Sequence, residues 1–273
     1  AMILFRSIRS GSSGNLLLLE QRDARGRRRL LIDCGLRSQR ACLEVLEAEV
    51  GLDAPPDALV VTHAHGDHVN YASLRTLTRL RVPILVHRRT RGEILRRHLN
   101  PYALPRSVSP DDIPLRTFGA EPFAVAGFTF TPLPLAHAPG TTTHGFLIES
   151  GRTRLVVASD FNDPEALLPH LYDADFVYIE CNYDPELLRL HFNPASLYHL
   201  PNHAAGLLLA HALAESRRAP RAIVLGHLSE ERNRPDIARR TVAGILREGG
   251  VLDGATLATA PRHEASPVWV IRE

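Results

Sequence analysis

Residues 62–68 read Thr-His-Ala-His-Gly-Asp-His and directly follow a short apolar run. Three imidazoles and a carboxylate so close together are costly to bury unless another group satisfies them. A divalent metal ion would do so, because ions such as zinc bind imidazole nitrogen and carboxylate oxygen. The spacing of His63 and His65 lets both reach one ion from extended backbone, while Asp67 and His68 face a second ion. We therefore interpret this segment as a metal-binding motif rather than a coincidental polar loop.

Composition limits the kinds of protein that could carry this motif. The 273-residue chain can bury a large core, and we expect a single domain over residues 1–273. The only methionine is at position 2, which indicates that Ala1 remains from an expression tag. The net charge of +2 gives no bulk electrostatic case for nucleic acid. All 32 basic residues are arginine, a bias expected of a GC-rich genome, although arginine also suits phosphate contacts.

The apolar and cysteine patterns predict a cytoplasmic protein without membrane contact. No stretch has the length of a membrane span, and none near the N-terminus resembles a signal peptide. The three cysteines are too few and too scattered for a disulfide framework, which fits a reducing compartment. Cys34 and Cys181 each follow an apolar run and an acidic residue, so we expect them to pack at strand ends. The sequence does not define the oligomeric state.

Short apolar runs alternate with helical patterns along the whole chain. This arrangement predicts an α/β fold in which two packed sheets are covered by helices, without a linker or repeat. We predict strands at residues 16–19, 30–32, 58–61, 84–86, 128–132, 143–149, 155–159, 176–180 and 222–225. We predict helices at residues 38–49, from about 71, and at 203–216 and 235–248.

Three further side chains that can bind metal come at the ends of predicted strands. They are His137, Asp160 and His227. Strand ends are where many folds place their chemistry, because the sheet is a rigid base for the loops above it. Each residue alone would be interpreted as a satisfied surface or core group. Together with the cluster at 63–68, they favour metal binding.

At this point the sequence resembles the metallo-β-lactamase superfamily of metallohydrolases. The signature His-x-His-x-Asp-His of that superfamily stands here at residues 63–68. Asp33 matches the acidic residue at the preceding strand end, and His137, Asp160 and His227 match the later ligand positions in order. The resemblance implies a four-layer αββα sandwich.

The resemblance covers roughly residues 5–235 and is greatest to a cytoplasmic branch of YycJ-like proteins, which are regarded as nucleases or phosphodiesterases. Three stretches carry this likeness: Ser10-Gly11-Ser12-Ser13-Gly14-Asn15, Glu180-Cys181-Asn182-Tyr183-Asp184 and Gly226-His227-Leu228-Ser229. Residues 199–202 also resemble a Gly-His-Leu-Ser-Asn segment of the branch. Tyr183 stands where histidine is common and Pro201 where serine is common, which leaves the exact substrate open.

The resemblance implies a dinuclear site with two divalent ions, which we expect to be zinc, with manganese or iron as alternatives. The implied ligands are His63, His65 and His137 for the first ion, Asp67, His68 and His227 for the second, and Asp160 as the bridge. Two cations ~4 Å apart need an anionic bridge to offset their repulsion. Coordination lowers the pKa of water toward ~7, so that a bridging hydroxide can attack a phosphodiester. Asp67 could orient this nucleophile as well as bind metal.

A leaving alkoxide needs a proton, and we assign that catalytic role to His199, with His203 behind it. An equally open interpretation is that His199 packs or caps at the start of the helix predicted at 203–216. The implied activity is a metal-dependent phosphodiesterase or nuclease acting on nucleic acid or a small nucleotide-like molecule. Thioester or lactone hydrolysis is an alternative, because hydroxide attack on a carbonyl needs the same groups. A non-catalytic, metal-stabilised scaffold is a more remote alternative.

Two other segments have both a structural and a functional interpretation. The small residues at 12–15 predict a tight turn, whose amides and hydroxyls could also face the substrate. The arginines between Arg88 and Arg97 follow a predicted strand and appear on a helical pattern. We favour a solvated helix face for them over the alternative, a track that binds phosphates near the cleft.

Overall fold

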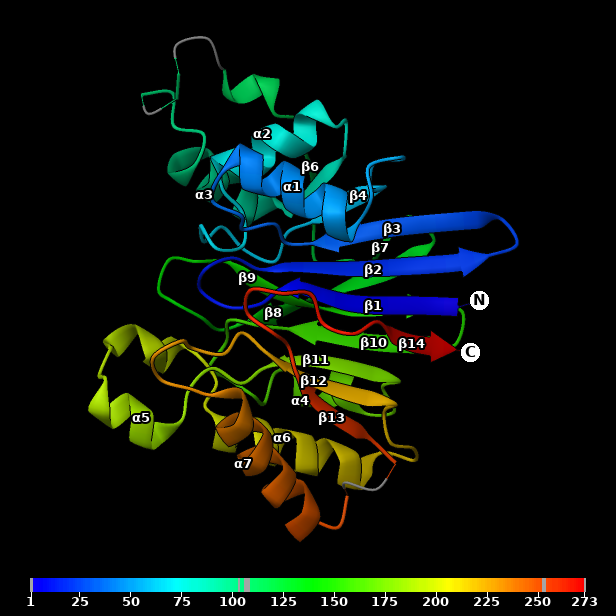
Figure 1. The fold of residues 1–273 in the computed structure, drawn as a ribbon, viewed down its shortest axis with the longest axis vertical. Coiled ribbons are helices and arrows are strands. Elements are labelled where there is room, and N and C mark those ends of the chain that lie inside the picture. The colour runs from blue at the N-terminus through cyan, green and yellow to red at the C-terminus, as the bar shows by residue number, and fades with distance from the viewer. Residues whose placement is uncertain (1, 103, 106–108, 252–253, 273) are drawn as a thin grey trace.

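The computed structural model describes residues 2–102, 104–105, 109–251 and 254–272. Two seven-stranded sheets pack face to face, and helices cover both outer surfaces (Figure 1). This confirms the α/β fold and the four-layer αββα sandwich expected from the sequence. None of the helices in the described ranges has the length and apolarity needed to cross a lipid bilayer.

The first sheet joins N-terminal antiparallel strands to a parallel group. Its strands, in spatial order, are β14 (Trp269–Arg272), β1 (Met2–Arg9), β2 (Leu16–Asp23), β3 (Gly26–Ile32), β4 (Ala58–Val60), β5 (Ile84–His87) and β6 (Leu115–Phe118). Strands β3 to β6 are parallel, so their carboxyl ends lie at one edge of the sheet. The loop that carries residues 62–68 leaves β4 at this edge.

The second sheet has the same division between antiparallel and parallel pairs. Its spatial order is β13 (Thr256–Thr259), β12 (Ala222–Gly226), β11 (Phe176–Glu180), β10 (Thr153–Ala158), β9 (Thr143–Ser150), β8 (Phe128–Leu135) and β7 (Phe123–Val125). Strands β10 to β13 are parallel. Their carboxyl ends point to the same edge of the molecule as those of the first sheet (Figure 1).

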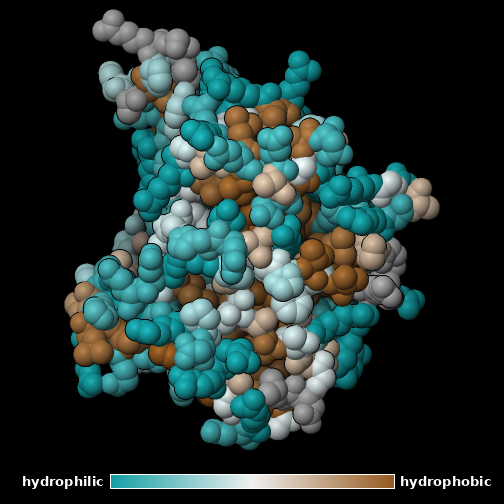
Figure 2. Space-filling view, viewed as in Figure 1, coloured by the Kyte–Doolittle hydropathy of each residue, from teal (hydrophilic) through white to brown (hydrophobic). Residues whose placement is uncertain are grey.

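Helices cover each sheet from outside. The first sheet is covered by α1 (Gln39–Glu49), α2 (Tyr71–Arg79) and α3 (Arg88–Arg97), and the second by α4 (Leu168–Leu171), α6 (Asn202–Glu215) and α7 (Pro235–Glu248). The short α5 (Pro185–Leu190) and two 3-10 turns, η1 (Pro110–Asp112) and η2 (Pro194–Tyr198), lie in connections. The surface is largely hydrophilic, with apolar areas that include one over α5, where Leu190 and Phe192 are exposed (Figure 2).

The alternation of side chains along each strand explains the layers. In β3, Leu30 and Ile32 point between the sheets, while Leu31 faces the first helix layer. In β11, Phe176 packs between the sheets and Val177 faces the second helix layer. Each of these side chains is almost fully buried, and each burial stabilises the folded state by about 2 kcal/mol. The apolar clusters on both faces of each sheet hold the strand ends rigidly in place.

Candidate metal centre

All seven side chains that the sequence analysis assigned as ligands meet at the shared carboxyl edge of the two sheets. The segment 63–68 comes from the loop after β4, and the other three residues follow β8, β10 and β12. Asp33, Asp160 and His227 have φ angles of 59°, 60° and 51°, which residues other than glycine seldom adopt. Such backbone conformations concentrate at functional sites, where the surrounding structure maintains them.

One close backbone contact keeps the two loops of the first sheet together. A Cβ atom on Gly35 would lie 1.7 Å from the carbonyl oxygen of Asp67, so only glycine fits here. Asn15 also donates from Nδ2 to that carbonyl at 3.1 Å. The loop after β3 and the turn after β1 therefore fix the position of Asp67.

The first group of metal-binding atoms comes from His63, His65, His137 and Asp160, which lie within 4.8 Å of one another. Nε2 of His137 is 3.3 Å from Nδ1 of His65. The same nitrogen of His137 is 3.8 Å from Oδ1 of Asp160, and Nε2 of His63 is 4.0 Å from that oxygen. Three imidazoles and one carboxylate thus face a common space.

The second group comes from Asp67, His68 and His227, again within 4.8 Å. Oδ2 of Asp67 is 3.7 Å from Nε2 of His68 and 3.5 Å from Nε2 of His227. Nε2 of His68 is also 3.0 Å from Oδ2 of Asp160. Asp160 therefore contacts both groups, one carboxylate oxygen toward each.

The remaining ring nitrogens of these histidines bind fixed partners, which differ between the two groups. In the first group each partner is a neutral oxygen: Thr62 Oγ1 for His63 (3.0 Å), Thr141 Oγ1 for His65 (3.3 Å) and the Tyr198 carbonyl for His137 (2.9 Å). In the second group the nearest partner is a carboxylate: Asp33 Oδ2 for His68 (2.7 Å, with Thr62 Oγ1 at 3.3 Å) and Glu180 Oε1 for His227 (2.8 Å). Such partners orient a metal-binding imidazole and set its tautomer.

Two polar atoms that face the shared space have no hydrogen-bond partner among the described residues. They are Nε2 of His63 and Nε2 of His227, and both are buried. Buried polar atoms without partners are rare in folded proteins and costly. A divalent cation would satisfy both, and the neighbouring carboxylates suit it as well. The residues present therefore fit divalent metal.

The two groups also differ in proton affinity when no metal is bound. Burial lowers the pKa of His63 and His137, and lowers that of His65 to about 4. For His68, burial opposes the charged form, but Asp160 and Asp33 outweigh it and raise the pKa. For His227, burial is likewise outweighed by Asp160, Asp67 and Glu180, which raise the pKa to about 10. Without metal, the first three imidazoles thus favour the neutral form, and the latter two favour the charged form.

His199 and Glu180 form a pair beside these groups. Nδ1 of His199 lies 2.6 Å from Oε1 of Glu180, the same oxygen that binds His227. Burial opposes protonation of His199, but Glu180 outweighs it and raises the pKa. The helix α6 begins at Asn202 with Pro201 as its N-cap, so His199 does not cap it. His203 is exposed on α6, outside these groups.

The sequence analysis did not assign a role to Glu180. The residue ends β11, as Asp160 follows β10 and His227 follows β12. The strand-end criterion that selected the other two would therefore have selected Glu180. Its contact with His199 depends on the path of η2, which no local pattern in the sequence indicates.

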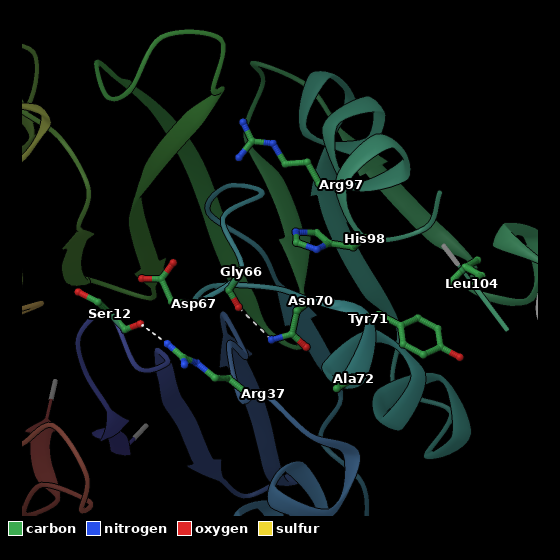
Figure 3. Close-up of a pocket in the computed structure, with 10 residues that line it drawn as sticks. All are labelled: Ser12, Arg37, Gly66, Asp67, Asn70, Tyr71, Ala72, Arg97, His98 and Leu104. Atoms are coloured by element: carbon green, nitrogen blue, oxygen red, sulfur yellow. Dashed lines mark hydrogen bonds between the residues drawn. The ribbon is translucent and has the colours of Figure 1, made fainter. Parts of the chain in front are cut away.

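Two cavities meet at this edge of the molecule. One, of about 260 Å³, is lined by five of the seven proposed ligands, namely His65, Asp67, His137, Asp160 and His227, and by His199. The other, of about 680 Å³, lies beside Asp67 (Figure 3). Ser12 lines both cavities, and the Gly14 amide donates to the Gly11 carbonyl at 2.9 Å, so the segment forms a tight turn with one residue facing the site.

A histidine–aspartate centre at the strand ends of a two-sheet sandwich is typical of the metallohydrolase class that the sequence resembles. The pattern of a family described as "Beta-lactamase superfamily domain" matches residues 28–227. The chain belongs to this superfamily. It is a metal-dependent hydrolase.

Individual relatives agree with this assignment. The exodeoxyribonuclease YycJ of Bacillus anthracis is 25% identical over 261 residues, which cover 90% of each chain. The metallo-β-lactamase fold protein YhfI from Bacillus subtilis has a TM-score of 0.71 at 20% identity, over 99% of this chain and 100% of that one. A diphosphatase from the PhnP family has a TM-score of 0.67 at 15% identity, over 100% and 99%. The predicted superfamily and YycJ-like branch are confirmed.

Proposed function

We propose that this chain is a dinuclear metal phosphodiesterase that cleaves nucleic acid. The observation that carries the proposal is the position of Asp160, whose two carboxylate oxygens each approach a separate group of donor atoms. A carboxylate shared in this way is what two neighbouring cations need. The exodeoxyribonuclease activity named for YycJ supports DNA as the substrate.

The first ion would be held by His63, His65 and His137, the second by Asp67, His68 and His227, and both by Asp160. Zinc suits this mixture of imidazole and carboxylate, and manganese and iron accept the same donors. Bound divalent ions supply Lewis-acid chemistry, polarising a phosphoryl oxygen and lowering the pKa of water. Asp67 has 22% of its side chain exposed, so it can also orient a water molecule that enters from the cavity.

His199 would donate a proton to the leaving oxygen. Glu180 holds its Nδ1 and favours the charged imidazolium. No described residue hydrogen-bonds to Nε2 of His199, which leaves that nitrogen to donate toward a substrate in the cavity. Glu180 acts as a positioning residue, because it sets the orientation and charge of His199 without lining that cavity.

We also propose the reducing cytoplasm as the compartment in which this enzyme works. All three cysteines are buried and unpaired. Free buried thiols fit a reducing environment.

The first experiment measures hydrolysis by protein whose zinc or manganese content has been determined. We expect release of nitrophenol from bis(p-nitrophenyl) phosphate and of nucleotides from 5′-labelled single-stranded DNA. His65→Ala should lose both activities. Metal-loaded protein that cleaves a thioester or lactone but neither phosphodiester would contradict the proposal.

The role of His199 can be tested by the choice of leaving group. Nitrophenolate leaves without a proton, whereas the alkoxide of DNA needs one. His199→Gln should therefore slow DNA cleavage by ~10²-fold or more, yet change bis(p-nitrophenyl) phosphate hydrolysis little. Equal losses on both substrates would indicate a structural role. His203→Gln, which changes an exposed histidine on α6, is the matched control.

A further inference from the structure

Helix α3 carries positive charge that the protein leaves unpaired. Its ten residues include Arg88, Arg89, Arg91, Arg96 and Arg97, all exposed, and a single acidic residue, Glu93. Within the described part of the chain, none of these arginines pairs with a carboxylate. Some exposed arginines on other helices have such partners, as in the pairs Arg40–Glu44, Arg189–Glu186 and Arg240–Asp236, but no other described helix carries five unpaired exposed arginines.

This helix is attached to the loop that orients a proposed metal ligand. Glu93 accepts a hydrogen bond from the Thr142 amide at 3.0 Å, and Thr90 donates to the Thr142 carbonyl at 3.3 Å. Arg97 donates to Thr141 Oγ1 at 3.3 Å, and the same hydroxyl contacts Nε2 of His65 at 3.3 Å. The end of α3 that carries Arg97 is therefore held close to the metal centre.

Arg97 also lines the 680 Å³ cavity beside Asp67, and Arg37 lines it from the other side (Figure 3). The two side chains approach from opposite sides of the loop that carries Gly66 and Asp67. The partner of Arg37 is the Ser12 carbonyl, at 3.4 Å, and like Arg97 it forms no ion pair with the described residues. Asp67 is the one carboxylate among the residues that line this cavity.

We propose that this cavity binds the nucleotide next to the cleaved bond, with Arg37 and Arg97 contacting the flanking phosphate. The remaining arginines of α3 would contact phosphates farther along the strand. Arginine suits this task because its guanidinium group binds phosphate oxygens bidentately. The inference rests on the proposed phosphodiesterase function. It adds where the strand lies beyond the cleaved bond: its flanking phosphate rests between Arg37 and Arg97.

The test compares substrates with and without flanking phosphates. Arg37→Gln and Arg97→Gln remove one charge each while keeping a hydrogen-bonding side chain. Arg240→Gln, on α7, is the matched control for loss of an exposed arginine. Each protein, loaded with manganese, is assayed on bis(p-nitrophenyl) phosphate, on a thymidine dinucleotide and on a thymidine strand of about 12 nucleotides. Binding is measured separately, by fluorescence anisotropy with a phosphorothioate strand of the same length at several salt concentrations.

For the long strand, we expect KM to rise about 10-fold in each cavity variant, with kcat within about twofold. The slope of log Kd against log salt should fall by about 0.7 for each arginine removed. In each cavity variant the KM for the long strand should rise several-fold more than the KM for either short substrate, and Arg240→Gln should match the unmodified protein on all three.

Equal KM values for long and short substrates in the unmodified protein would overturn the inference, as would cavity variants that bind the strand normally. Failure of the phosphodiesterase proposal has a different signature, since no protein would then hydrolyse bis(p-nitrophenyl) phosphate. The binding measurement still decides the inference in that case, because it needs no turnover.

Discussion

The two halves of the metal centre orient their histidines by different means. In one half, the hydroxyls of Thr62 and Thr141 and a backbone carbonyl bind the outer ring nitrogens. In the other half, the carboxylates of Asp33 and Glu180 do so. A neutral acceptor fixes the orientation of an imidazole, whereas a carboxylate also increases its basicity. The comparison teaches that imidazole donors held by different partners would give the two proposed ion sites unequal sensitivity to protons.

Removing the charge that both halves share should have the largest effect. In Asp160→Asn, neither proposed ion keeps its bridging carboxylate, and hydrolysis should fall by at least ~10³-fold. Asparagine tolerates the left-handed backbone of this position, so the fold should persist. Metal content and phosphodiester hydrolysis, measured with circular dichroism as the folding control, test this. Full metal content and normal activity would show that Asp160 does not bridge.

The second-largest effect should be a difference in how the metal affinities of the two halves depend on pH. His68 and His227 have raised pKa values, that of His227 about 10, so the charged form of each is favoured and must lose its proton before the ring binds metal. The affinity of the second ion should therefore increase with pH, by at least about 10-fold per unit while His227 is charged, with between one and two protons released. His65, with a pKa of about 4, releases none at neutral pH. Titration calorimetry in buffers of different ionisation enthalpy measures the released protons, and equal release by both ions would contradict the comparison.

Changing one carboxylate partner should weaken one half more than the other. Asp33→Asn keeps the shape and the left-handed backbone, but it removes the charge beside Nδ1 of His68. We expect the affinity of the second ion to fall by about 10- to 100-fold, and that of the first to fall less, because Asp33 reaches His63 only through Thr62 Oγ1. Competition with a chromophoric chelator resolves the two affinities. A similar loss for both ions would mean that Asp33 supports the whole site.

The smallest effect is expected for a neutral partner. Thr141→Val removes the hydroxyl that contacts Nε2 of His65 and conserves volume. The affinity of the first ion should fall by less than about 10-fold, because water can replace a neutral acceptor at this half-exposed position. The same chelator competition measures it. A loss as large as that of Asp33→Asn would remove the distinction between the halves.

The sequence was sufficient to predict which side chains meet, because the seven proposed ligands come from one local motif and from three strand ends. Parallel strands bring such ends to one edge whatever the details of their packing. The outer partners were not predictable in this way. Tyr198 contributes a backbone carbonyl, which carries no side-chain signal, and Glu180 meets His199 only through the path of η2.

Some elements of the fold could not be predicted from sequence patterns. The predicted strands and helices are all present, whereas the strands β1, β6, β7, β13 and β14 and the short helices α4 and α5 were not predicted. Apart from the eight-residue β1, each of these strands has only three or four residues, which is too short for an alternation of apolar and polar side chains to be recognised. Their pairing depends on the neighbouring strand rather than on their own residues.

The left-handed backbone at Asp33, Asp160 and His227 restricts how this protein can diverge. At each position a replacement must meet a conformational demand as well as a chemical one, and most side chains lose about 1–2 kcal/mol in that conformation. Asparagine and glycine lose least. Descendants that abandon catalysis while keeping the fold should therefore accumulate asparagine or glycine at these three sites, and seldom valine or isoleucine.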